Sequence, residues 1–102
     1  MDLLLRPTVF DGDKMKDDYC VFHEGRIVGR IILASDRSWR GVCWDWYINP
    51  PLPIPPWAHG TADSLEAAKT KFKAAWEQFY ASLTPEMIKH WHHTEDRQAA
   101  KP

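Results

Sequence analysis

The chain has no long hydrophobic run and no marked excess of charge of either sign. The apolar stretch Leu3–Leu5 ends at Arg6-Pro7, so it is much shorter than the ~20 residues of a membrane span or the roughly 7 to 15 of a signal peptide. The 13 basic and 14 acidic residues nearly cancel, so no global field would attract a nucleic acid or an anionic membrane. We therefore expect a cytoplasmic protein without membrane association, in which nucleic-acid binding would require a local patch.

Cysteine is also scarce. The two cysteines, Cys20 and Cys43, lie in separate apolar segments, where a free cysteine behaves as a small hydrophobic residue. A single domain of 102 residues buries about 60 to 65% of its unfolded surface and can fold without a covalent link. We therefore expect one domain with no disulfide.

Motifs that would indicate catalysis are missing. The sequence contains no HExxH, no paired CxxC and no glycine-flanked serine at a strand-to-helix turn. His90 and His93 are three residues apart and would share one face of a helix, whereas His92 would point elsewhere, and two ligands do not form a closed metal site. Gly25 and Gly29 do not precede a helix, as the glycines of a phosphate-binding loop do. These absences predict no metal, no cofactor and no enzymatic activity.

Tryptophan, in contrast, is abundant: the chain has six. Each large aromatic ring buries about 150 to 250 Å², so a few of them can fill a small core or dominate a contact surface. In residues 39–48, Trp44, Trp46 and Ile48 alternate with Asp45, which will avoid an apolar interior. This alternation predicts a strand with its tryptophans in the core.

A β-hairpin is predicted over residues 19–34. Glu24-Gly25 is typical of a two-residue loop, because glycine readily adopts positive φ. Such a loop would place Phe22 opposite Ile27 and Tyr19 opposite Arg30, and cross-strand partners share a face. The face expected in the core comprises Cys20, Phe22, Ile27, Ile31 and Leu33. The other face comprises Tyr19, Val21, His23, Arg26, Val28, Arg30 and Ile32.

The segments around this sheet differ in character. Residues 1–17 show no sustained period and are expected to form a flexible N-terminal arm. Residues 50–57 hold five of the eight prolines and lack most of the amide donors that a ladder needs. This segment is either a stiff structural crossover lying along its own domain or a ligand motif for an SH3 or WW type groove.

Two helices are predicted after the proline-rich segment. Asp63 and Glu66 have the spacing of a capping box, which marks a helix start. Thr84-Pro85 combines a capping residue with a favoured first helical residue, so a second helix runs to about Arg97, before a disordered tail over residues 99–102. The apolar stripe of the first helix is expected to pack on the sheet and consists of Leu65, Ala68, Phe72, Ala75, Trp76, Phe79 and Leu83. The sequence thus predicts an α+β domain over residues 18–98: a three-stranded antiparallel sheet packed against a long helix, followed by a second C-terminal helix.

Several stretches also resemble a known group of proteins. They are Asp18–Ile31, the Trp44-x-Trp46 pair, Gly60–Trp76 with Glu66-Ala67 and Phe72–Glu77, and Leu83–Glu86. Over roughly residues 18–95 the chain is similar to a group of small uncharacterised α-proteobacterial proteins. That group has no assigned activity, cofactor or catalytic residue, so the resemblance implies the architecture and no function.

The outer face of the sheet is the candidate working surface. Aromatic and arginine side chains are enriched at protein interfaces, and the same composition can stack single-stranded bases. Alternatively, Arg30 could simply cover Tyr19 and pair with Asp45, under another segment. We expect a small non-catalytic interaction protein, an adaptor, regulator or stoichiometric inhibitor of the kind found among small phage-borne proteins, with a protein partner; the alternative is a nucleic-acid-binding module using the same face. The proposed contact residues are Tyr19, Arg26, Val28, Arg30 and Tyr47.

Overall fold

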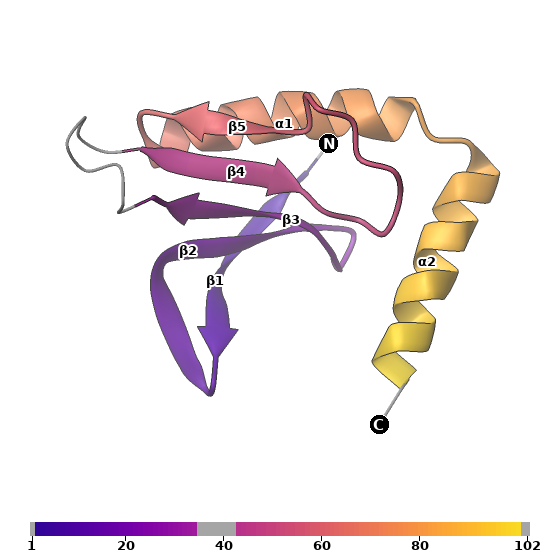
Figure 1. The fold of residues 1–102 in the computed structure, drawn as a ribbon. Helices are drawn as coiled ribbons and strands as arrows, with labels where there is room; N and C mark the ends of the chain where they lie inside the picture. Colours follow the sequence, from indigo (N-terminus) through magenta and orange to yellow (C-terminus); the bar gives the residue numbers. More distant parts are fainter. Residues whose placement is uncertain (1, 35–42, 101–102) are drawn as a thin grey trace.

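Five strands in sequence order form one antiparallel sheet, and two helices follow (Figure 1). The computed structural model describes residues 2–34 and 43–100. The elements are β1 (Leu4–Phe10), β2 (Asp13–His23), β3 (Arg26–Leu33), β4 (Trp44–Ile48), β5 (His59–Ala62), α1 (Leu65–Ala81) and α2 (Pro85–Ala100). The α+β class, the antiparallel sheet and the two successive helices are confirmed, but the sheet has two strands more than the predicted three.

The first additional strand, β1, comes from the segment expected to be a flexible arm. Asp11 and Gly12 adopt φ values of 53° and 83°, as the loop of a two-residue hairpin requires, and they join β1 to β2. Leu4 pairs with Phe22 at the far end of this ladder. The arm prediction is therefore wrong for residues 4–17, because they form β1, the turn after it and the first part of β2.

The second additional strand, β5, follows the proline-rich segment. At the start of this connection the Asn49 amide donates to the Val28 carbonyl at 2.9 Å, and the Ile48 amide donates to the Ala58 carbonyl at 2.9 Å. Pro50 is buried, and Leu52 packs against the core. The segment thus connects β4 to β5 along its own domain, as the crossover interpretation expects.

The α1 helix packs its apolar stripe on the sheet. Its N-cap is Ser64, whose Oγ accepts from the Ala67 amide at 3.1 Å, so the predicted cap at Asp63 is one residue early. The helix lies over β3, β4 and β5, along one side of the sheet (Figure 1). Its buried residues are Ala68, Phe72, Ala75, Trp76 and Phe79, and on β4 they face Trp44, Trp46 and Ile48, which are buried as predicted. Trp39 and the expected strand start lie outside the described residues.

The α2 helix turns away from the end of α1 and runs beside the sheet (Figure 1). Thr84 Oγ1 accepts from the Met87 amide at 3.2 Å, which confirms the predicted cap. The helix continues to Ala100, so residues 99 and 100 are helical and not part of a tail. Its buried Trp91 meets Trp76 edge to face, with ring centroids 5.8 Å apart. Both cysteines are free, as expected.

Candidate interaction surface

The β2–β3 hairpin contains a bulge that changes which residues face the core. Phe22 pairs with Ile27 as predicted, but Val21 pairs with Gly29, so Val28 is an additional residue on β3. Beyond the bulge, each residue of β2 pairs with a residue of β3 one position later than predicted. Tyr19, for example, lies opposite Ile31 and not opposite Arg30. Since a shift of one residue exchanges the two faces, the predicted assignment of Cys20 and Phe22 to the core is wrong.

Burial agrees with the shifted register. Val21, Val28 and Ile31 are fully buried, whereas Ile27 is 43% exposed. Gly29 is the residue that makes this arrangement possible, because an added Cβ there would overlap the Phe72 ring and the Tyr47 carbonyl oxygen. The close approach of α1 thus depends on a residue without a side chain.

The five proposed contact residues are consequently not all on one surface. Tyr19 packs on the α1 side, 6.5 Å from Trp44 between ring centroids, and Val28 is buried. Arg26 lies at the β2–β3 turn, where its Nη1 donates to Glu95 at 3.0 Å and to Asp96 at 3.2 Å. Arg30 and Tyr47 remain together, as cross-strand partners on the face opposite α1.

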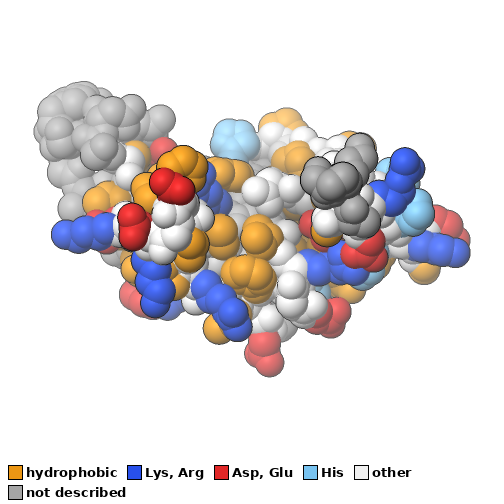
Figure 2. Space-filling view, turned by 90° about the horizontal axis from the view of Figure 1, so that it is seen from below, with side chains coloured by type: hydrophobic (Ala, Val, Ile, Leu, Met, Phe, Trp, Pro, Cys, Tyr) orange, Lys and Arg blue, Asp and Glu red, His pale blue; other side chains and the backbone are white. Residues whose placement is uncertain are grey.

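We call this face, the side of the sheet opposite α1, the open face. Within the described residues, neither helix packs across it. Figure 2 looks from below, towards the side from which the β1–β2 hairpin and α2 project, and shows hydrophobic side chains interspersed with charged side chains of both signs. The residues of the open face follow from the pairing of neighbouring strands. One row across all five strands consists of Arg6, Cys20, Arg30, Tyr47 and His59. A second row consists of Leu4, Phe22 and Ile27.

Apolar side chains of the second row are accessible. Leu4 is 51% exposed and Ile27 is 43% exposed. Between them, Phe22 is half-buried, with the Arg6 guanidinium carbon 5.5 Å from its ring centroid. An accessible apolar row flanked by arginine has the composition of an interface core.

An ion pair stabilises the neighbouring part of the face. Arg30 Nε donates to Asp18 Oδ1 at 2.7 Å, and Arg30 Nη2 donates to Asp18 Oδ2. Thr8 Oγ1 donates to the same carboxylate at 2.8 Å. The hydrogen bond from Arg30 holds the pKa of Asp18 below its usual value, against the opposing effect of burial. Arg30 is thus the partner of Asp18 and not, as one interpretation expected, of Asp45.

Asp18 reaches this position through an irregularity in β2. Pro7 pairs with Tyr19 and Val9 pairs with Lys14, so several residues of β2 oppose only Thr8 on β1. Asp17 takes up the extra length with a φ of 55°, a left-handed conformation that aspartate tolerates better than most residues. Asp18, the next residue, is only 2% exposed. A buried carboxylate of this kind needs its charged partner.

The histidines do not form a metal centre in the part of the chain that the structure describes. No group of three or more histidine, cysteine or acidic residues there is arranged to hold a metal ion. His90 and His93 line a shallow depression with Glu86 and Lys89, whereas the buried His23 packs edge to face against Tyr80 at 5.1 Å between centroids. Among the described helices, none is both long and apolar enough to cross a membrane.

The sequence reasoning missed several residues of the open face: Leu4, Arg6 and His59 were not placed in the sheet, and Cys20, Phe22 and Ile27 were assigned to the core. The signal for the first two was present, because Asp11-Gly12 is a strong hairpin turn that would have extended the sheet back to Leu4. His59 had no such signal, since β5 is only four residues long.

No protein-family model, curated protein or solved structure matches this chain.

Proposed function

We propose that the chain is a small non-catalytic interaction protein that binds a protein partner through the open face. The observation that carries this proposal is that helix α1 covers only one of the two faces of the sheet. Helix α1 lies against one face, while the other carries accessible apolar side chains at Leu4 and Ile27 beside two arginines. Contiguous accessible apolar residues with a polar surround are characteristic of interaction sites.

Charge favours a protein partner over a nucleic acid. Arg30 is neutralised by the buried Asp18, and Asp45 lies in the next row of the same face. Binding to phosphates depends on releasing counterions from uncompensated basic residues, and this face offers few of them. Protein interfaces need no net positive field and use arginine and tyrosine as anchors.

A nucleic-acid-binding module is the second candidate, and one observation favours it. Arg6, Arg30, Tyr47 and His59 lie side by side across the strands, a basic and aromatic row on which single-stranded bases could stack. Binding of this kind weakens steeply between 50 and roughly 200 mM salt, whereas burial of apolar side chains does not. A salt titration of the recovered complex separates the two candidates.

Two isoleucine variants test the proposal. Ile27 on the open face and Ile54 in the β4–β5 connection are exposed to nearly the same extent, 43% and 41%. Replacing either by aspartate leaves the core intact, so both variants should fold with melting temperatures close to that of the wild type. We expect Ile27→Asp to abolish capture of the partner from cells that naturally express the chain, and Ile54→Asp to retain it. Equal capture by both variants, or loss only with Ile54→Asp, would contradict the assignment to the open face.

Arg30 itself is a poor probe of binding. Its substitution would leave Asp18 buried without its counter-ion, so the loss of binding and the loss of folding could not be separated. Arg6 is the better choice on this face, because it is exposed and its replacement by glutamate removes an arginine anchor without opening the core.

A further inference from the structure

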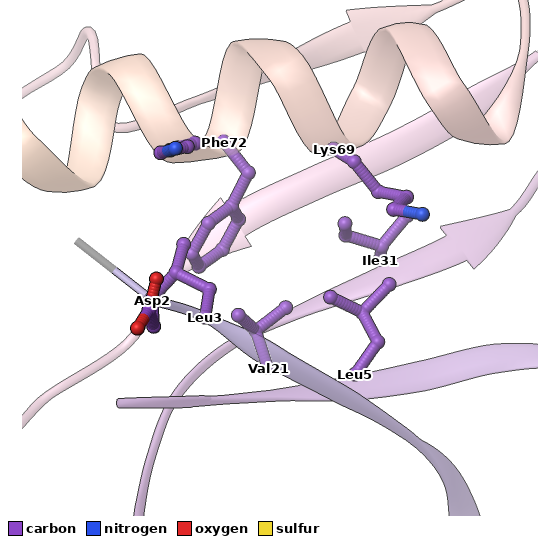
Figure 3. Close-up of a pocket in the computed structure, with 8 residues that line it drawn as sticks. Asp2, Leu3, Leu5, Val21, Ile31, Lys69 and Phe72 are labelled. Carbon is purple, nitrogen blue, oxygen red and sulfur yellow. The ribbon is translucent and has the colours of Figure 1, made fainter. Parts of the chain in front are cut away.

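A cavity of about 370 Å³ lies on the other side of the sheet, between α1 and β1 (Figure 3). It exists because α1 covers β3, β4 and β5 and does not extend over the first two strands. Leu5 on β1 and Leu3 just before this strand are only partly buried as a result. The volume falls within the range of about 300 to 1,000 Å³ that is usual for small-molecule sites.

Most of the lining of this cavity is apolar. Leu3 and Leu5 form one wall, Val21 and Ile31 lie on the sheet, and Phe72 extends from α1 towards Leu3 (Figure 3). Val21, Ile31 and Phe72 belong to the buried core, so the ligand would be in contact with the most rigid part of the molecule. A hydrocarbon chain is the ligand body that such walls accommodate.

The charged residues of the lining are two lysines and one aspartate. Lys69 and Lys73 are one helical turn apart on α1, and Asp2 belongs to the N-terminal segment that also contributes Leu3. The Lys69 ammonium pairs with Glu66 at 3.1 Å, but both side chains are well exposed, and exposed pairs of this kind contribute little. Lys69 can therefore exchange Glu66 for the carboxylate of a ligand.

We propose that this cavity binds a medium-chain fatty acid. Its hydrocarbon chain would lie against Leu3, Leu5 and Phe72, and its carboxylate would lie at Lys69 and Lys73. The proposal is independent of the open face, which lies on the opposite side of the sheet. It commits to a free fatty acid, since the apolar walls line a concave site of limited volume and do not form a flat surface for a bilayer.

A chain-length series with hexanoate, octanoate and decanoate, measured by calorimetry below their micelle concentrations, tests the apolar part. Each added methylene should raise the affinity about fourfold until the cavity is filled, and then the affinity should level off. Absence of binding at millimolar octanoate overturns the proposal. Binding only to anionic phospholipid vesicles, with none of the free acids bound, also overturns it.

Matched variants test the position of the ligand. Leu5→Phe fills the cavity, whereas Leu4→Phe changes the neighbouring residue on the opposite face of the same strand. We expect octanoate binding to fall at least tenfold in Leu5→Phe and to stay within twofold in Leu4→Phe, with both variants showing the wild-type pattern of amide resonances. Equal affinity in the two variants would place the ligand elsewhere and overturn the assignment.

Lysine variants test the carboxylate. Lys69→Gln and Lys73→Gln should each weaken octanoate binding by up to about fivefold, the usual range for an exposed ion pair, while the neutral octan-1-ol is unaffected. Lys89→Gln, on α2, is the control and should change neither. A loss that is the same for octanoate and octanol would refute the role of the lysines as carboxylate partners.

Discussion

The ion pair between Asp18 and Arg30 leads to a prediction about stability. Replacing Arg30 by methionine keeps most of the aliphatic side chain and removes the guanidinium that donates to Asp18. Breaking a buried pair in this way costs about 3 to 5 kcal/mol, because the remaining charge stays buried. Since the Arg30 side chain is 35% exposed, water can replace part of the lost interaction, and we expect a loss of about 2 to 3 kcal/mol at pH 7.

The loss should depend on pH in a defined direction. In the wild type the pKa of Asp18 is lowered below its unfolded value of about 3.9, so the pair stabilises the fold above that pH and is lost as the pH falls through the lowered pKa. In Arg30→Met the same carboxylate is buried without a cation, which raises its pKa above the unfolded value. Protonation of Asp18 removes the buried charge and so stabilises the variant. The difference in free energy of unfolding between the variant and the wild type should therefore shrink as the pH falls from 7 towards about 3.5.

Urea denaturation of both proteins across this pH range measures the deficit directly. Arg6→Met is the matched control, because Arg6 lies on the same face over the Phe22 ring, and its loss should cost about 0.5 to 1 kcal/mol independently of pH. An Arg30→Met deficit that is the same at pH 7 and pH 3.5 would show that the lost stability comes from packing. The reasoning about the buried carboxylate would then be refuted.

Three further outcomes are expected. Trp76→Ala should destabilise the fold by about 3 to 5 kcal/mol, since Trp76 is fully buried. The control Trp57→Ala, at a position 41% exposed, should change the free energy of unfolding by less than about 1 kcal/mol, and an unchanged melting temperature in Trp76→Ala would contradict the packing of α1. Gly29→Ala should cost about 1 to 3 kcal/mol in chemical denaturation, because the new methyl group overlaps the Phe72 ring, and a neutral effect would mean that α1 is not seated there. Arg26→Gln should leave the urea denaturation midpoint close to that of the wild type but increase amide hydrogen exchange in the C-terminal half of α2, and unaltered exchange would show that its ion pairs do not hold that helix.

Much of the architecture could be predicted from local signals. The three-and-four spacing of the α1 stripe, the Thr84-Pro85 start of α2 and the alternation around Trp46 each depend on a short segment and on the period of its own secondary structure. The structure agrees with each of them. Asp11-Gly12 was also a local signal, and reading it as a hairpin loop would have placed β1 in the sheet.

The assignment of residues to the two faces of the sheet, in contrast, was decided by tertiary structure. A single extra residue at Val28 exchanges the faces of the hairpin, and the bulge is accommodated where Gly29 lies under Phe72, a residue 43 positions later in the sequence. The partner of Arg30 was likewise beyond local reasoning, because Asp18 turns towards it through an irregular stretch of β2 opposite Thr8. The sequence by itself determined the two helices, the β2–β3 hairpin and the strand around Trp46, since these depend on interactions within a few residues. Register, bulges and ion pairs between distant strands depend on how the segments pack, and these decided which side chains form the open face.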